Sequence, residues 1–415
     1  MFSLLDLAAS LLVLSTIFEW LNKRYLALPS SIGLLGMGLI ASLLFVAVGT
    51  LFPGHPVLRR VVAALQSIDF ESTVMNGLLA FLLFAGALHL DVGNLRGRAV
   101  PVAMTATVGV LISTAFIGGT IWLASSAIGH AVALPWALVF GALISPTDPV
   151  AVLGTLKAVK VPQELETDMA GESLFNDGVG VVVFTLLLAI ASGQHASAGG
   201  VALLFLREAI GGACLGFVTG WIGFQMTRRV DEYTLEVMLS LALATGTYAL
   251  AQAIDTSGPI AVVVAGLFLG SRGAKYGMSD QTKRYVFGVW EVVDYALNSV
   301  LFLLIGLEVL VMNFDVKVLP VAILAVPTAL AGRFLSIGAA VVLLSRFVHF
   351  PRGTVAVLTW GGLRGGISIA LALALPETQY KAGLLAATYA VAIFSILVQG
   401  GSLGLVARRR ASVPE

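Results

Sequence analysis

The chain has 415 residues, of which 58% are hydrophobic and only 11% are charged, and its net charge is +1 at pH 7. A soluble domain carries roughly 25% charged residues because water must wet its surface, so a soluble protein is excluded and the apolar surface must face lipid. The near-zero charge, without a basic cluster, argues against nucleic acid as a partner. The single cysteine, Cys214, excludes an internal disulfide and a cysteine-based metal site. We therefore expect an all-α integral membrane protein.

A helix needs about 20 apolar residues to cross the hydrocarbon core, and this rule predicts about thirteen spans. The first segment lacks the basic start and the cleavage pattern of a signal peptide, so we expect it to be a retained helix. The predicted spans are 3–21, 30–51, 70–90, 99–126, 132–157, 164–192, 200–227, 233–254, 258–272, 284–312, 317–346, 353–376 and 381–406.

Basic residues set the expected orientation of these spans. They follow the odd-numbered spans, from Lys23 and Arg24 after the first to Arg408 after the last. The loops after the even-numbered spans contain almost no basic residues. Arg59 and Arg60, in an outer loop, are the exceptions. Because basic residues collect on the cytoplasmic side, we expect the N-terminus outside and the C-terminus in the cytoplasm, with the protein in the cell membrane.

Two spans contain helix-breaking sequences. Ser145–Pro149 places two prolines within five residues of the fifth span, and Gly361–Ser368 places four glycines within six residues of the twelfth. Irregular backbone at membrane depth survives only where it lines a cavity, so we expect two broken, crossing helices in inverted repeats, a pointer to a transporter's binding site. The alternative for the fifth segment is a re-entrant turn or a loop between two short spans.

A polar cluster opens the sixth span. Helical spacing places Ser173 and Asp177 on one face with Asn176 beside them, and these oxygens suit Na⁺ or Li⁺ and a proton. Glu172 points to another face and needs another partner. Arg333, in the middle of the eleventh span, stays charged and must pair with a buried carboxylate; Glu172 is the best candidate. The alternative to an ion-binding role is a structural one, in which these side chains only form hydrogen bonds that join neighbouring helices.

These motifs resemble those of the NhaP-type sodium/proton antiporters of the monovalent cation/proton antiporter superfamily, which are related to the animal sodium/proton exchangers. The resemblance rests on Thr147-Asp148-Pro149, the run from Gly171 to Asp177, and Gly362–Gly366, and it covers essentially the whole chain.

The resemblance implies a role for each matching residue. Asp177 would bind Na⁺ and H⁺ alternately, with Ser173 and the main chain of Thr147 as further Na⁺ ligands. Asp148 and Asn176 would hold water around the ion and brace the broken helix. Glu172 and Arg333 would form the ion pair of the moving core, and Arg364 would support the crossing helices.

The resemblance also implies a division of the chain. Residues 98–197 (helices 4–6) and 317–407 (helices 11–13) would form the moving core. Residues 1–95 (helices 1–3) and 198–312 (helices 7–10) would form a scaffold that dimerises, and 408–415 would be a short cytoplasmic tail. Some relatives add a glutamate from the third span to the site, but Leu83–Leu88 contains no acid here.

We therefore expect a transporter and not an enzyme, without a cofactor, whose partners are a monovalent cation, a proton, the lipid bilayer and a second copy of the chain. Na⁺ or Li⁺ exchanges for H⁺ by alternating access, and the exchange is electroneutral because Asn176 cannot release a proton. A K⁺/H⁺ antiporter of the same fold remains an alternative. An ion channel would need a filter motif that we do not find, and an aspartyl protease would need a Gly-x-Gly-Asp context that neither Asp148 nor Asp177 has.

Overall fold

The computed structural model describes residues 4–52, 70–127, 129, 131–193, 198–310 and 318–411, and every regular element within them is a helix. The first half contains α1 (Leu4–Leu21), η1 (Asn22–Leu26), α2 (Ser30–Leu51), α4 (Phe70–Ser72), η2 (Thr73–Leu78), α5 (Leu79–His89), α6 (Val92–Gly97), α7 (Ala99–Met104), η3 (Thr105–Gly109), α8 (Val110–Ala127), α9 (Leu134–Ile144), α10 (Val150–Val159), α11 (Gln163–Ala191) and α12 (Ala198–Thr227). The second half contains α13 (Tyr233–Ala253), α14 (Gly258–Phe268), η4 (Leu269–Gly273), α15 (Ala274–Tyr276), α16 (Asp280–Glu308), α17 (Leu319–Leu344), α18 (Thr354–Trp360), α19 (Gly366–Leu373), α20 (Lys381–Phe394), η6 (Ser395–Gly400) and α21 (Gly401–Ala411).

Each predicted span corresponds to one helix or to a consecutive run of helices. Within the described residues, eight helices are long and apolar enough by themselves to cross a membrane, and the third, fifth, ninth and twelfth predicted spans are divided into shorter pieces. The fold class predicted from the sequence is thus confirmed. The exceptions to the charge pattern, Arg59 and Arg60, lie outside the described residues.

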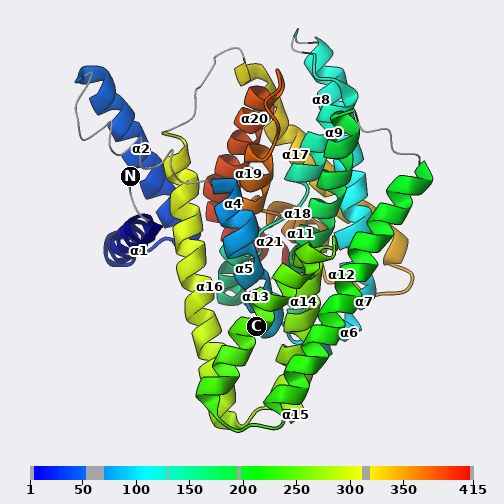
Figure 1. Cartoon of the computed structure of the whole chain (residues 1–415). Coiled ribbons are helices and arrows are strands. Elements are labelled where there is room, and N and C mark those ends of the chain that lie inside the picture. Colours follow the sequence, from blue (N-terminus) through cyan, green and yellow to red (C-terminus); the bar gives the residue numbers. More distant parts are fainter. Residues whose placement is uncertain are drawn as a thin grey trace.

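Two of the apolar cores are each shared by several of the helices labelled in Figure 1. In one group α8, α9, α11, α17, α19 and α20 share an apolar core that includes Phe140, Leu143 and Leu371. In the other, α5, α13, α14 and α16 enclose Phe84 and Trp290, and α2 packs along α16. Small residues allow the closest approach, because Gly38 of α2 faces Gly306 of α16 with almost no space for a side chain on either.

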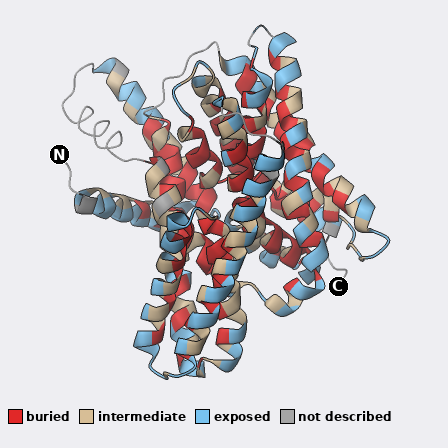
Figure 2. Cartoon of the chain, turned by 45° about the vertical axis from the view of Figure 1, so that its right-hand side comes forward, coloured by how far each residue is buried: buried red, intermediate tan, exposed pale blue. Residues whose placement is uncertain are grey.

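The outer surface is apolar, as a lipid-facing surface must be. Buried residues concentrate between the helices, and exposed residues cover their outward faces (Figure 2). Large hydrophobic side chains such as Leu43 at 61% and Val342 at 73% exposure belong to these outward faces. In water such a surface would aggregate, so its exposure fits burial in a bilayer.

The first helix differs in direction from its neighbours. In Figure 1, α1 lies across α2 and α16 and not alongside them. It is attached by Glu19, whose Oε1 accepts hydrogen bonds from Ser30 Oγ at 2.7 Å and from Tyr295 Oη at 2.5 Å. The end of α1 is therefore fixed to the start of α2 and to the middle of α16.

The two predicted breaks are both present, and they meet. Residues 145–149 separate α9 from α10, and residues 361–365 separate α18 from α19. Asp148 N donates to Leu363 O at 2.8 Å, and the two segments form an antiparallel bridge. Gly365 lies so close to the Asp148 carboxyl group that a Cβ at this position would collide with it. The crossing of the two broken spans therefore depends on their small, proline- and glycine-rich sequences.

Candidate ion-binding site

Arg364 holds the crossing together. Its side chain is 2% exposed, and Nη1 donates to the main-chain oxygens of Ser145 at 2.5 Å and Pro146 at 2.9 Å. These carbonyls follow the last turn of α9, where helix carbonyls lack partners within the helix and carry partial negative charge. The Arg364 guanidinium thus lies at this helix end, where a positive charge is favourable.

Asn176 braces the break from the neighbouring helix α11. Its Nδ2 donates to Thr147 Oγ1 at 2.9 Å, and its Oδ1 accepts from Thr147 N at 3.2 Å. The Thr147 hydroxyl also lies 3.0 Å from Ser173 Oγ. The side chains of Asn176 and Ser173 are therefore both hydrogen-bonded to Thr147. Neither residue lines the cavity described next.

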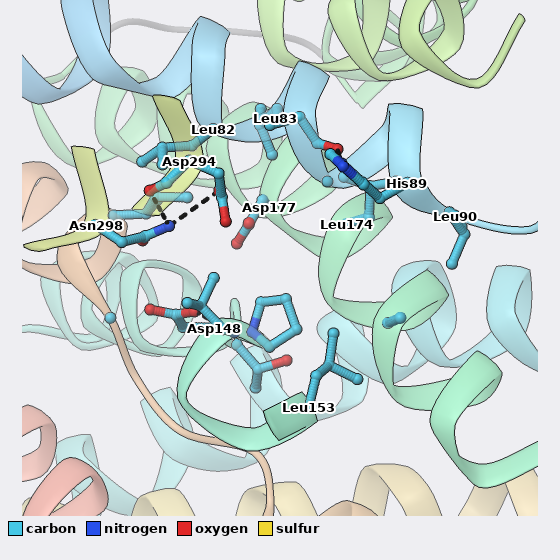
Figure 3. A pocket seen from close by; sticks show the side chains of 18 of the residues that line it. Leu82, Leu83, His89, Leu90, Asp148, Leu153, Leu174, Asp177, Asp294 and Asn298 are labelled. Carbon is cyan, nitrogen blue, oxygen red and sulfur yellow. Dashed lines mark hydrogen bonds between the residues drawn. The ribbon is translucent and has the colours of Figure 1, made fainter. Parts of the chain in front are cut away.

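A cavity of about 500 Å³ reaches this crossing. Thr147, Asp148 and Asp177 line its inner part, and Figure 3 shows the Asp148 and Asp177 side chains on its wall. Its outer part is lined by residues of predicted cytoplasmic connections, including Asp91 and Lys157. The cavity therefore leads from one face of the protein to the broken helices.

The two aspartates differ in their hydrogen bonding. Asp148 Oδ1 accepts from Val150 N at 2.8 Å, so this carboxylate occupies the N-terminal end of α10, where backbone N–H groups favour an anion. Asp177 is only 7% exposed, yet within the described part of the chain no residue donates a hydrogen bond to it or forms an ion pair with it. A buried carboxylate without a partner is costly. Asp177 is thus the group in this cavity that most needs a cation or a proton.

Glu172 and Arg333 lie together behind the site. Arg333 Nη2 donates to Glu172 Oε2 at 2.9 Å, Nη1 pairs with Oε1, and the side chains are about 1% and 5% exposed. Arg333 Nε also donates to Leu358 O in α18 at 3.2 Å. One ion pair therefore connects α11, α17 and the broken twelfth span, in the arrangement that the sequence suggested.

Sequence reasoning missed a second buried ion pair. Arg98, which follows the third predicted span, is 7% exposed; Nε donates to Asp168 Oδ1 at 2.8 Å and Nη1 to His349 O at 2.8 Å. It also missed Asp294 and Asn298 of α16 and Ser368 of α19, which line the cavity. Charge within a predicted span is the signal that could have found Asp294, since 294 lies inside the predicted span 284–312.

A helical membrane protein with two broken spans crossing at a buried, unpaired carboxylate has the architecture of an ion-coupled secondary transporter. The chain matches the transmembrane family of sodium/hydrogen exchangers over residues 8–409. It is 44% identical over 412 residues to the Na⁺/H⁺ antiporter NhaP of Pseudomonas aeruginosa, covering 98% of this chain and 97% of the relative. It is 37% identical over 384 residues to the Na⁺/H⁺ antiporter NhaH of Halobacillus dabanensis, covering 90% of each.

Solved structures include the sodium proton antiporter MjNhaP1 of Methanocaldococcus jannaschii at pH 8. It matches with a TM-score of 0.73 at 20% identity, over 96% of each chain, so it shows that the fold is shared. The chain belongs to the sodium/hydrogen exchanger family. The family suggested by the motifs around Asp148, Asp177 and Arg364 is thereby confirmed.

Proposed function

We propose that the protein exchanges Na⁺ or Li⁺ for H⁺ across a membrane, and that the cation and the proton compete for Asp177. The observation that carries this proposal is the carboxylate of Asp177, which is buried, has no partner among the described residues, and lies on the wall of a cavity open to one side. A cation and a proton each satisfy such a group, but not both at once. The antiporter relatives support the choice of Na⁺.

In the proposal, the residues around Asp177 supply the ligands that contact the ion directly. The backbone at Thr147 is the second ligand in the proposal, because Thr147 lies at the inner end of the cavity. Ser173 contacts the Thr147 hydroxyl and not the cavity, so it joins the Na⁺ only if that hydrogen bond opens, and otherwise it orients Thr147. Asp148 borders the cavity and can hold water of the ion's hydration shell.

The charges of the site support electroneutral exchange of one cation for one proton. Glu172 is neutralised by Arg333, which cannot lose its proton. Asn176 cannot titrate, and Asp148 accepts a backbone N–H that favours its anion. Asp177 alone then alternates between a sodium carboxylate and a neutral acid, and both loaded forms are uncharged.

Alternating access requires one part of the protein to move against the other. We assign residues 98–197 and 317–407 to the moving core and residues 1–95 and 198–312 to the scaffold. In support, the cavity lies between these parts, since Asp148 and Asp177 border it from the core and Leu83 and Asp294 from the scaffold. Beyond the crossing, packed side chains such as Leu143 and Leu371, with 0% and 2% exposure, close the way to the opposite face. A cavity closed at one end fits a carrier better than a channel.

The arrangement in the membrane is part of the proposal. Basic residues mark the face to which the cavity opens, as Lys157 at its rim illustrates. We therefore place this face in the cytoplasm of the cell, the N-terminus outside and the C-terminus inside. The scaffold helices carry broad apolar faces, and through them we expect a homodimer.

Exchange in proteoliposomes tests the function. After a pH gradient, acidic inside, has been imposed, external Na⁺ and Li⁺ should each dissipate it at saturable rates, and K⁺ should not. Exchange driven by K⁺ alone would favour the K⁺/H⁺ antiporter. Clamping the membrane potential at zero and at about −100 mV, a bias of about 2.3 kcal/mol per charge moved, should leave the equilibrium unchanged. An equilibrium that follows the voltage would refute one-for-one exchange.

A further inference from the structure

One face of α16 borders the cavity opposite the crossing. Glu291, Asp294, Asn298 and Leu301 line the cavity at helical spacings of three and four residues, so they share one face of this helix. Glu291 is exposed, Asp294 is half-buried, and Asn298 is only 6% exposed. Polar side chains therefore follow the cavity wall from its open end toward Asp177.

Asp294 and Asn298 form a fixed pair. Asn298 Nδ2 donates to Asp294 Oδ1 and to Asp294 O, both at 3.0 Å. In the described part of the chain no other residue donates to the Asp294 carboxylate, and no basic side chain forms an ion pair with it. Figure 3 shows the pair and Asp177 on neighbouring parts of the cavity wall. One oxygen of Asp294 and the amide oxygen of Asn298 thus remain available to a ligand.

Two further polar groups indicate that the cavity holds a polar ligand. Asp177 has no partner among the described residues, as shown above. Ser368 of α19 lines the same cavity at 1% exposure, and its hydroxyl also has no hydrogen-bond partner among them. A buried polar group without a partner costs about 1–3 kcal/mol, so a hydrated cation in this cavity would satisfy Asp177, which lies on its wall.

We propose that Asp294 and Asn298 form a second cation-binding station, at which a cation entering from the open side binds before it reaches Asp177. The proposal rests on the proposed cation/proton exchange. No three Asp, Glu, His or Cys side chains in the described residues are close enough together to hold one ion. In the proposal the Asp294 pair and Asp177 act as successive sites for a monovalent cation, and both line the same cavity.

The position of the station in the fold defines its role. Because α16 belongs to the scaffold, Asp294 stays in place when the core carries the ion across. It then raises the occupancy of the inner site from one side only and adds no charge to the transported unit.

The test measures Na⁺ dependence from each side in proteoliposomes of uniform orientation. Asp294→Asn keeps the size of the side chain and removes its charge. The half-saturating Na⁺ concentration on the cavity side should rise by roughly fivefold to tenfold. The maximal rate should stay within about twofold, and the opposite side should be unaffected. Asn298→Ala should raise the same concentration by a smaller factor, because Asp294 remains but is less well oriented. Glu291→Gln, on the same helix at the exposed mouth, is the matched control and should have little effect.

The outcomes separate the two proposals. If wild-type protein shows no exchange of any monovalent cation for protons, the proposed function itself fails. If wild-type protein exchanges and Asp294→Asn keeps the wild-type Na⁺ dependence, the second station is refuted and the function stands. Equal weakening from both sides would also refute it, because Asp294 would then move with the ion or act on the fold. Melting temperatures in detergent show whether each variant is folded.

Discussion

The ion pair between Glu172 and Arg333 can be tested by a double-mutant cycle. Glu172→Gln leaves a buried guanidinium that keeps the Leu358 carbonyl and an amide oxygen as partners. Arg333→Met leaves a carboxylate at 1% exposure whose donors are lost. Removing one partner of a buried pair costs about 3–5 kcal/mol. We therefore expect the loss of stability to be near the lower end of this range for Glu172→Gln and near the upper end for Arg333→Met.

The free energy of unfolding should fall much less in the double variant than the sum of its decreases in the two single variants. With both charges removed, no uncompensated charge remains, and we expect a coupling free energy of at least about 2 kcal/mol. The measurement is the free energy of unfolding of wild-type protein, both single variants and the double variant in mixed detergent micelles. Glu377 and Lys381 supply the control cycle, because their pair at 2.8 Å is exposed and should couple by less than about 1 kcal/mol. Additive losses at Glu172 and Arg333 would show that the pair does not stabilise the core as a unit.

Three further predictions concern the site and the assembly. Asp177→Asn should abolish exchange and leave a folded protein, because the exchanging carboxylate is gone; appreciable transport in liposomes would remove Asp177 from the central role. Arg364→Gln should destabilise the protein by about 1.5–3 kcal/mol, since the carbonyls of Ser145 and Pro146 lose a charged donor; an unchanged melting temperature would argue against a bracing role. Cross-linking in mild detergent should trap a homodimer through the scaffold helices, and a purely monomeric protein would contradict that assignment.

Much of the fold could be predicted from the sequence because the bilayer imposes strong rules. Apolar segments of about 20 residues give the spans directly. The prolines of Ser145–Pro149 and the glycines of Gly361–Gly366 identify both breaks, since several such residues close together strongly disfavour a continuous helix. The relative direction of α1 could not be predicted, because hydropathy fixes the length of a helix and not its tilt.

The candidate site shows where sequence reasoning reaches its limit. A residue such as Asp177 is recognisable because a charge inside a span is costly and needs a function. Which atoms face the ion depends on side-chain directions that spacing leaves open. Helical spacing placed Ser173 on the face of Asp177, but its hydroxyl contacts Thr147. Asp294 is recognisable as a charge inside a predicted span, but it lies more than a hundred residues away from Asp177 in sequence, so only the packed structure shows that both line one cavity.

The central claim is that Na⁺ and H⁺ occupy Asp177 in turn, and proton release on Na⁺ binding tests it most directly. Na⁺ is titrated calorimetrically into purified protein in two buffers of different ionisation enthalpy, between about pH 5 and pH 8. At the acidic end, one proton should leave for each Na⁺ bound, and the apparent affinity should fall about tenfold per pH unit. Asp177→Asn should show neither effect. Na⁺ binding that releases no proton and ignores pH over this range would contradict the account.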